Sequence, residues 1–254
     1  MESRIVWKRK VLLNILLLII FILLVWYLKD NQSKFNLIKN IDLVSFTILS
    51  LLALATGLVN GWKVKFYTAM FQLQLPFKEW FGLGQITSMT NYLIPFKGGT
   101  AVRALYLRKK HDFPYEKFVV TLAATTLIAF FVYSVVGLIA IGYVSVAFKK
   151  SSMVMAAIFV GVLAASLCAF FFPIGLFNKI KVDNFLIRKL RSVVEGWHHI
   201  KNNPLHVMMI AVLELSFIIV YSLSLFFGFK AVDVQIPLVF CLLIALLSGM
   251  SVVI

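Results

Sequence analysis

Long apolar runs separated by short basic segments dominate the chain. Five of these runs are long enough to cross a bilayer, because about 20 helical residues span its roughly 30 Å of hydrocarbon. They cover residues 11–28, 41–62, 118–148, 153–177 and 205–229. The third run is too long for one upright helix, so it tilts, breaks near Gly137 or Gly142, or begins in the interface. The pattern predicts an all-α integral membrane protein.

A further apolar run, residues 80–96, has a different character. Polar side chains interrupt it, and it ends in Pro95 followed by the pair Gly98-Gly99. The polar residues are Gln85, Thr87, Ser88, Thr90 and Asn91. Polar groups and a broken backbone at membrane depth are tolerated only inside protein or beside a water-filled cavity, where transporters hold their substrates. The run is therefore the candidate substrate segment.

The Lys and Arg residues place the N-terminus in the cytoplasm. With this orientation the cytoplasmic segments hold 19 of the 25 Lys and Arg, including Lys63 and Lys65 after the second span, and the outer segments hold 6. Cytoplasmic loops carry the excess of these residues. Both loops that flank residues 80–96 are then cytoplasmic, which predicts a re-entrant segment. The alternative is a short full span that breaks the charge rule.

Residues 237–254 resemble residues 80–96 in their position along the chain. Each of the two directly follows a full span, and Pro76 and Pro237 precede similar small residues and a Met at matching distances. Because the preceding spans run in opposite directions, the two segments would enter from opposite sides, as in an inverted-topology repeat. Chance similarity at a few positions is the alternative. On this interpretation residues 1–254 form one polytopic domain that stops inside its second re-entrant segment.

The composition supports a membrane protein and narrows its chemistry. Hydrophobic residues make up 61% of the chain and charged residues 14%, against about 25% charged in soluble domains. The net charge of +15 is spread over short loops, so a nucleic-acid partner is not expected. Cys168 and Cys241 lie in apolar runs, and neither a nucleotide-binding loop nor metal-ligand spacing is present. We expect no metal, no cofactor and no catalytic residue.

Four residues after the substrate segment are candidates for binding an anionic headgroup: Lys97, Gly98, Gly99 and Arg103. A glycine pair before a helix exposes backbone N–H groups, which suit a phosphate together with the two cations. Plain anchoring at anionic headgroups is the alternative.

Glu214 is the one acid well inside a predicted span, roughly 14 Å along its helix. A carboxylate there is costly and functional by default. We expect it to serve as the intramembrane counter-charge of Arg103 or Lys97, or to handle a proton. The alternative is a helix shifted so that Glu214 lies near the interface.

Residues 178–203 have apolar positions at helical spacing with basic residues largely off that face. The apolar positions are Val182, Leu186, Leu190, Val193, Trp197 and Ile200. We predict a cytoplasmic amphipathic helix on the anionic inner leaflet, where each basic residue contributes about 1 kcal/mol of attraction.

The spacing Asn91-x-x-x-Pro95-x-x-x-Gly99-x-x-x-Arg103, followed by a basic loop, resembles the motif of the lysylphosphatidylglycerol synthase transmembrane region. That family includes the flippase half of bacterial multiple peptide resistance factors. The resemblance implies a multi-pass protein of the bacterial cytoplasmic (inner) membrane, related to cationic peptide resistance. Its substrate would be a phospholipid or a polyprenyl-linked lipid, handled by Asn91, Pro95, Gly99 and Arg103.

We expect a flippase-like protein that translocates or handles an anionic phospholipid or a lipid-linked precursor, and two alternatives remain open for the function. One is a membrane-embedded transferase, similar to a phosphatidylglycerol lysyltransferase or a glycosyl transferase. The other is a non-catalytic subunit that docks a lipid-modifying synthase through residues 178–203. In larger members of the family a separate cytosolic domain makes the aminoacyl lipid, and these residues contain no such domain.

Overall fold

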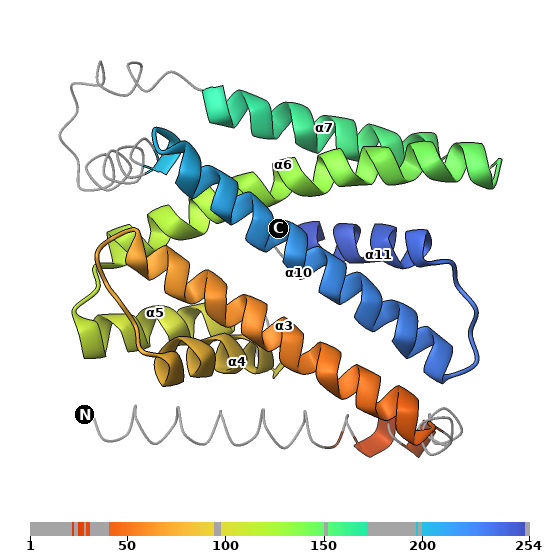
Figure 1. Ribbon diagram of the computed structural model, residues 1–254, viewed down its shortest axis with the longest axis horizontal. Helices are drawn as coiled ribbons and strands as arrows, with labels where there is room; N and C mark the ends of the chain where they lie inside the picture. The colour runs from red at the N-terminus through yellow and green to blue at the C-terminus, as the bar shows by residue number, and fades with distance from the viewer. Residues whose placement is uncertain are drawn as a thin grey trace.

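The computed structural model describes residues 41–93, 98–149, 152–171 and 200–251, together with Trp197 and isolated residues between Ile22 and Asp30. Helices cover most of this part of the chain, which contains no strand (Figure 1). They are α3 (Leu43–Ala69), α4 (Phe77–Leu93), α5 (Gly98–His111), α6 (Tyr115–Ala147), α7 (Met153–Phe171), α10 (Pro204–Ala231) and α11 (Leu238–Ser251). The predicted all-α fold is confirmed.

Helices α3, α6, α7 and α10 are long and apolar enough to cross a membrane. They coincide with four of the five predicted spans. Helix α6 is a single helix of 33 residues, so the chain does not break near Gly137 or Gly142. The first predicted span, residues 11–28, lies largely outside the described residues, as does most of the predicted amphipathic helix, residues 178–203.

Helix α3 extends beyond the predicted span. The apolar run ends at Trp62, and Lys63 was expected to lie in a cytoplasmic loop. Instead the helix continues to Ala69, and Lys63 is buried within it. The expected loop at this position is wrong, because the side chain of Lys63 meets an acid from another helix and so does not need water.

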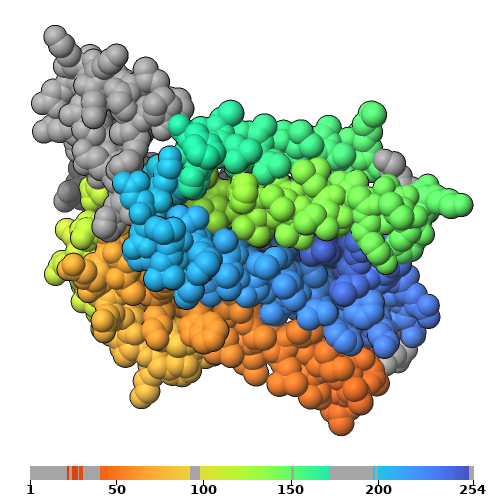
Figure 2. Space-filling view, turned by 45° about the horizontal axis from the view of Figure 1, so that its top comes forward, coloured from red at the N-terminus to blue at the C-terminus, as the bar shows by residue number. Residues whose placement is uncertain are grey.

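Helices α3 and α10 lie side by side and run in opposite directions through the middle of the molecule (Figure 1). Helix α6 packs against α10, α11 and α7, and α7 forms one edge of the bundle. Figure 2 shows the order α7, α6, α10 and α3 across one face. One buried hydrophobic cluster lies among α6, α7, α10 and α11, and another lies among α3, α6 and α10.

Helices α4 and α5 form a hairpin whose two open ends meet on the same side of the molecule (Figure 1). Phe71, before α4, contacts Phe113, after α5, with 6.0 Å between ring centroids. Glu79 near the start of α4 pairs with Lys110 near the end of α5, with 2.9 Å between Oε1 and Nζ. The chain thus enters and leaves the hairpin on one side, which is the geometry that a re-entrant segment requires.

Helix α11 is placed like α4, at the opposite end of the α3 and α10 pair. Each of the two follows a proline, Pro76 or Pro237, and packs back against the long helix that precedes it. Because α3 and α10 are antiparallel, α4 and α11 return from opposite ends (Figure 1). An inverted repeat has this arrangement, and the repeat itself stays a prediction.

Glycines allow α3 and α4 to approach closely. A Cβ added to Gly84 would lie 2.5 Å from the backbone N of Gly61, and a Cβ on Gly61 would lie 2.6 Å from the ring of Trp80. Asn60 Nδ2 donates to Ser88 Oγ at 2.8 Å across the same contact. Gly57 and Gly61 form a GxxxG pair, a spacing that lets membrane helices pack backbone to backbone. The hairpin is therefore fastened to α3 through α4.

Candidate functional site

Glu214 is buried in the bundle and accepts hydrogen bonds from three side chains on two other helices. Lys63 Nζ lies 2.7 Å from Oε2, and the Tyr133 hydroxyl donates to the same oxygen at 2.8 Å. The Tyr67 hydroxyl donates to Oε1 at 3.2 Å. Lys63 and Tyr67 reach one carboxylate because residues four positions apart share a helix face. These four residues form what we call the Glu214 cluster.

The Glu214 cluster differs from the expected ion pair. Arg103 or Lys97 was the predicted partner of Glu214, and the structure provides Lys63 instead. Lys97 lies outside the described residues, and Arg103 forms no ion pair with any residue that the structure describes. Glu214 therefore pairs with Lys63 and not with Arg103 in this structure, while a contact with Lys97 or the handling of a proton stays a prediction.

The Glu214 cluster holds its charges at a high cost in desolvation. The side chains of Lys63 and Glu214 are 11% and 7% exposed. A buried ion pair gains little net stability, because the loss of hydration offsets the attraction between the charges. The ring of Phe217, 4.1 Å from Lys63 Nζ, and the two tyrosine hydroxyls supply the remaining contacts. Stability alone does not explain why the cluster is charged.

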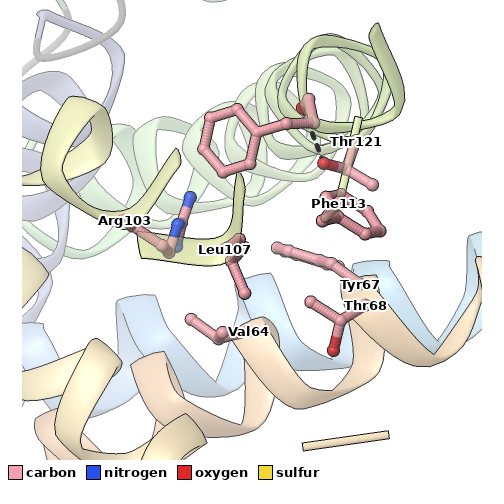
Figure 3. Close-up of a pocket in the computed structure, with 8 residues that line it drawn as sticks. Val64, Tyr67, Thr68, Arg103, Leu107, Phe113 and Thr121 are labelled. Atoms are coloured by element: carbon pink, nitrogen blue, oxygen red, sulfur yellow. Dashed lines mark hydrogen bonds between the residues drawn. The ribbon is translucent and has the colours of Figure 1, made fainter. Parts of the chain in front are cut away.

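A pocket lies next to the Glu214 cluster, between α3, α5 and α6 (Figure 3). Its lining consists of Val64, Tyr67, Thr68, Arg103, Leu107, Phe113, Phe118 and Thr121. The centre of a water molecule can occupy about 10 Å³ of this pocket, so the pocket has room for about one water. Tyr67 belongs to both sites, since it lines this pocket and donates to Glu214.

Arg103 supplies the charge of the pocket. Its side chain is half-buried, and its guanidinium carbon lies 5.3 Å from the centroid of the Phe118 ring. The hydroxyls of Thr68 and Thr121 donate to the carbonyls of Lys65 and Phe118 in their own helices, at 3.1 and 2.7 Å. Those two hydroxyls can therefore only accept from a ligand. An anion in the pocket would depend on the five N–H donors of Arg103.

Asn91 and Gly99 close the hairpin. The Gly99 N–H donates to Asn91 Oδ1 at 3.0 Å, so Asn91 satisfies one of the free donors at the start of α5. A Cβ on Gly99 would collide with the carbonyl of Thr87 on α4. The spacing from Asn91 to Gly99 thus follows from packing of the hairpin. The N–H of Gly99 is engaged inside the protein, and contact of Gly98 or Gly99 with a headgroup stays a prediction. Pro95 lies outside the described residues.

A family model described as the lysylphosphatidylglycerol synthase TM region matches residues 11–254. The chain belongs to the lysylphosphatidylglycerol synthase TM region family. Comparison with curated proteins and with solved structures gives no match. The membership and the four apolar helices together make this chain a multi-pass membrane protein.

In this member of the lysylphosphatidylglycerol synthase TM region family, the recognised motif serves two purposes. Asn91 and Gly99 hold α4 to α5, and Arg103, one turn after Gly99, lines the pocket. Sequence reasoning missed Lys63, Tyr67 and Tyr133. The available signal was the spacing of Lys63 and Tyr67 at the end of an apolar run, on one helix face. Among the described residues, no three His, Cys, Asp or Glu side chains gather as a metal site.

Proposed function

We propose that this chain translocates an anionic phospholipid or lipid-linked precursor across the bacterial cytoplasmic membrane. Arg103 carries the proposal. It is a half-buried cation on the hairpin, it lines a pocket, and it has no carboxylate partner among the described residues. A cation within a membrane protein is costly and marks a substrate pathway or a partner. A guanidinium binds phosphate with two parallel hydrogen bonds, so a lipid phosphate suits it.

The outer surface of the hairpin suits the acyl chains of such a lipid. Ile86 and Met89 on α4 and Val102 and Leu105 on α5 are exposed apolar side chains. A headgroup that reaches Arg103 could therefore leave its tails in the bilayer beside the hairpin. The pocket has room for about one water and has to widen to admit a headgroup. The contact between α5 and α6 is small, which makes it the place to open.

The family context suggests what this transport contributes to the cell. An aminoacylated phosphatidylglycerol keeps the phosphate that Arg103 would bind but is no longer anionic overall, so moving it to the outer leaflet would lower the negative surface charge there. Cationic peptides bind membranes through that charge. The proposed role is thus a contribution to cationic peptide resistance.

Reconstitution tests the proposal. The full chain is placed in vesicles with phosphatidylglycerol that bears a reducible fluorophore, and a membrane-impermeant reductant reports the lipid that reaches the outer leaflet. We expect Arg103→Gln to slow the transfer about tenfold or more, since a hydrogen bond to a charged group contributes about 1.5–3 kcal/mol. Lys109→Gln, an exposed cation on the same helix, is the matched control. Equal rates for the wild type and Arg103→Gln would sink the proposal.

A second candidate is a membrane subunit that docks a lipid-modifying synthase. The observation in its favour is a group of exposed basic residues where α5 ends and α6 begins: Arg108, Lys109, Lys110 and Lys117. This candidate predicts that a synthase co-purifies with the chain and that the chain alone moves no lipid. A transferase would instead turn over lipid with a soluble donor, so the same purified protein separates the three functions.

A further inference from the structure

One side chain connects the Arg103 pocket to the buried carboxylate of the Glu214 cluster. Tyr67 lines the pocket, and its hydroxyl donates to Glu214 Oε1 at 3.2 Å. The pocket itself has room for about one water. A water in the pocket, the Tyr67 hydroxyl and Glu214 would form a short chain of hydrogen-bonding groups that leads from the pocket to an otherwise enclosed carboxylate.

The charges around Glu214 are few. Among the described residues, the titratable groups bonded to it are Lys63 and Tyr67 on α3 and Tyr133 on α6, and α11 brings the buried thiol of Cys241 to the same bundle. Helix α11, which also packs against α10, carries no charged residue. Lys63 and Glu214 cancel each other, so Arg103 supplies the net positive charge beside the pocket. A proton on Glu214 would add a second positive charge, because Lys63 would then lose its counter-ion.

We propose that Glu214 binds a proton and that this proton is linked to the binding of an anionic headgroup in the Arg103 pocket, which makes the chain a proton-coupled lipid transporter. The inference rests on the proposed function and adds its coupling ion. The freed charge of Lys63 and the charge of Arg103 attract an anion more strongly than Arg103 alone. By linkage, the bound anion raises the affinity of Glu214 for its proton to the same extent.

The proton takes a defined route. A pocket water passes a proton to the oxygen of Tyr67 while Tyr67 passes its own hydroxyl proton to Glu214 Oε1. One O–H bond forms on Glu214, Tyr67 ends neutral, and the water recovers a proton from bulk solvent. The step involves no proton of Lys63. The cost of a buried ion pair fits this role, since ionisable groups inside membrane proteins recur in proton relays.

Lipid binding as a function of pH tests the inference without any transport assay. The purified full chain in detergent is titrated with dioctanoyl phosphatidylglycerol at a series of pH values, and a pH indicator in weak buffer records proton uptake. We expect the Kd to fall by up to about tenfold per pH unit as pH falls, the limit for one linked proton. We also expect proton uptake on mixing with the lipid.

Variants assign the proton to Glu214. Glu214→Gln should remove the pH dependence of the Kd and the proton uptake. Tyr67→Phe should slow the proton uptake while its final amplitude is kept. If Glu214→Gln fails to fold because Lys63 loses its partner, Lys63→Met with Glu214→Gln removes both charges and answers the same question. Asp233→Asn, an exposed carboxylate in the turn after α10, is the control and should keep the wild-type pH profile.

The outcomes separate the two proposals. Wild-type protein that binds phosphatidylglycerol with the same Kd at every pH overturns the inference and leaves the proposed function in place. A Glu214→Gln variant that keeps the wild-type pH slope overturns it as well. A wild-type protein that binds no phosphatidylglycerol overturns the inference together with phosphatidylglycerol as the substrate of the proposed function.

Discussion

Lys63 and Glu214, which are 151 positions apart in the chain, meet inside the bundle with 2.7 Å between Nζ and Oε2. Lys63 comes from α3 and Glu214 from α10, the two antiparallel helices at the centre of the molecule. Tyr133 from α6 donates to the same carboxylate. The carboxylate of Glu214 therefore links three helices, and loss of its ion pair should lower the free energy of unfolding.

Removal of one member of this pair is expected to cost more than removal of both. Lys63→Met leaves the carboxylate of Glu214 buried without its cation, and Glu214→Gln leaves the ammonium of Lys63 buried without its anion. Each change should therefore lower the free energy of unfolding by about 3–5 kcal/mol. The double variant should be more stable than the sum of the single changes predicts. Reversible unfolding in mixed micelles measures all four proteins. Additive losses would show that the two side chains do not stabilise each other.

Two glycines on α4 should respond oppositely to the same change. Gly84→Ala places a methyl group against the backbone of Gly61 and should destabilise by about 1–3 kcal/mol, as overpacking does. Gly82→Ala meets nothing within 4 Å and should be neutral or stabilising by up to about 1 kcal/mol. Thermal unfolding of the two variants makes the comparison. A Gly84→Ala variant as stable as Gly82→Ala would contradict the tight contact between α3 and α4.

Asn91 should matter for the stability of the hairpin. Asn91→Ala removes the acceptor of the Gly99 N–H and should cost about 0.5–2 kcal/mol, the range for loss of a helix cap. Thr90→Ala is the neighbouring control, because among the described residues the Thr90 hydroxyl donates to the carbonyl of Ile86 in its own helix. Thermal unfolding again gives the measurement. The cap has no energetic role if the two variants melt together.

The stability contributed by the ion pair at the open end of the hairpin should depend on pH. A hydrogen bond from Lys110, helped by one from His111, holds the pKa of Glu79 below its ordinary value of 4.5. A lowered folded-state pKa stabilises the protein above the unfolded-state pKa, and this contribution is lost as pH falls through the lower value. The difference in melting temperature between wild type and Glu79→Gln should be full above about pH 5 and shrink in more acidic buffer. A difference that stays constant with pH would exclude this ion pair as the cause.

Cysteine labelling tests whether the hairpin is re-entrant. With the exposed Cys168 replaced by Ser and the buried Cys241 replaced by Ala, single cysteines at Lys78 and Lys117 should both react with an impermeant reagent from the cytoplasmic side. A cysteine at Lys149, in the turn between α6 and α7, should react from the other side. All three positions are exposed. Labelling of Lys78 and Lys117 from opposite sides would make the segment a full span.

The spans could be predicted because run length depends only on local sequence. The hairpin was suggested by polar residues, a Pro-Gly end and basic flanks, all of which are local as well. The partner of Glu214 could not be predicted in this way. Lys63 stands one residue past the apolar run, where a lysine normally faces water, and only the packing of α3 against α10 brings it to Glu214.

The contact between α3 and α4 could have been suspected from the sequence but was not. Gly57 and Gly61 are visible as a GxxxG pair in the second predicted span. The partner surface around Gly84 is not recognisable in the same way, because Gly82 on the same helix looks equivalent, yet a Cβ added there would meet nothing within 4 Å. Which glycine is covered depends on how the two helices are rotated against each other, and tertiary packing decides that.

The glycine contact also determines how the hairpin can move. Its α4 edge lies backbone to backbone against α3 at Gly61 and Gly84, whereas its α5 edge meets α6 only lightly. A unit held along one edge turns about that edge as an axis. Rotation about the α3 and α4 seam would carry Arg103 away from Phe118 while the central pair of antiparallel helices stays in place. Such a rotation would widen the pocket without separating α3 from α10.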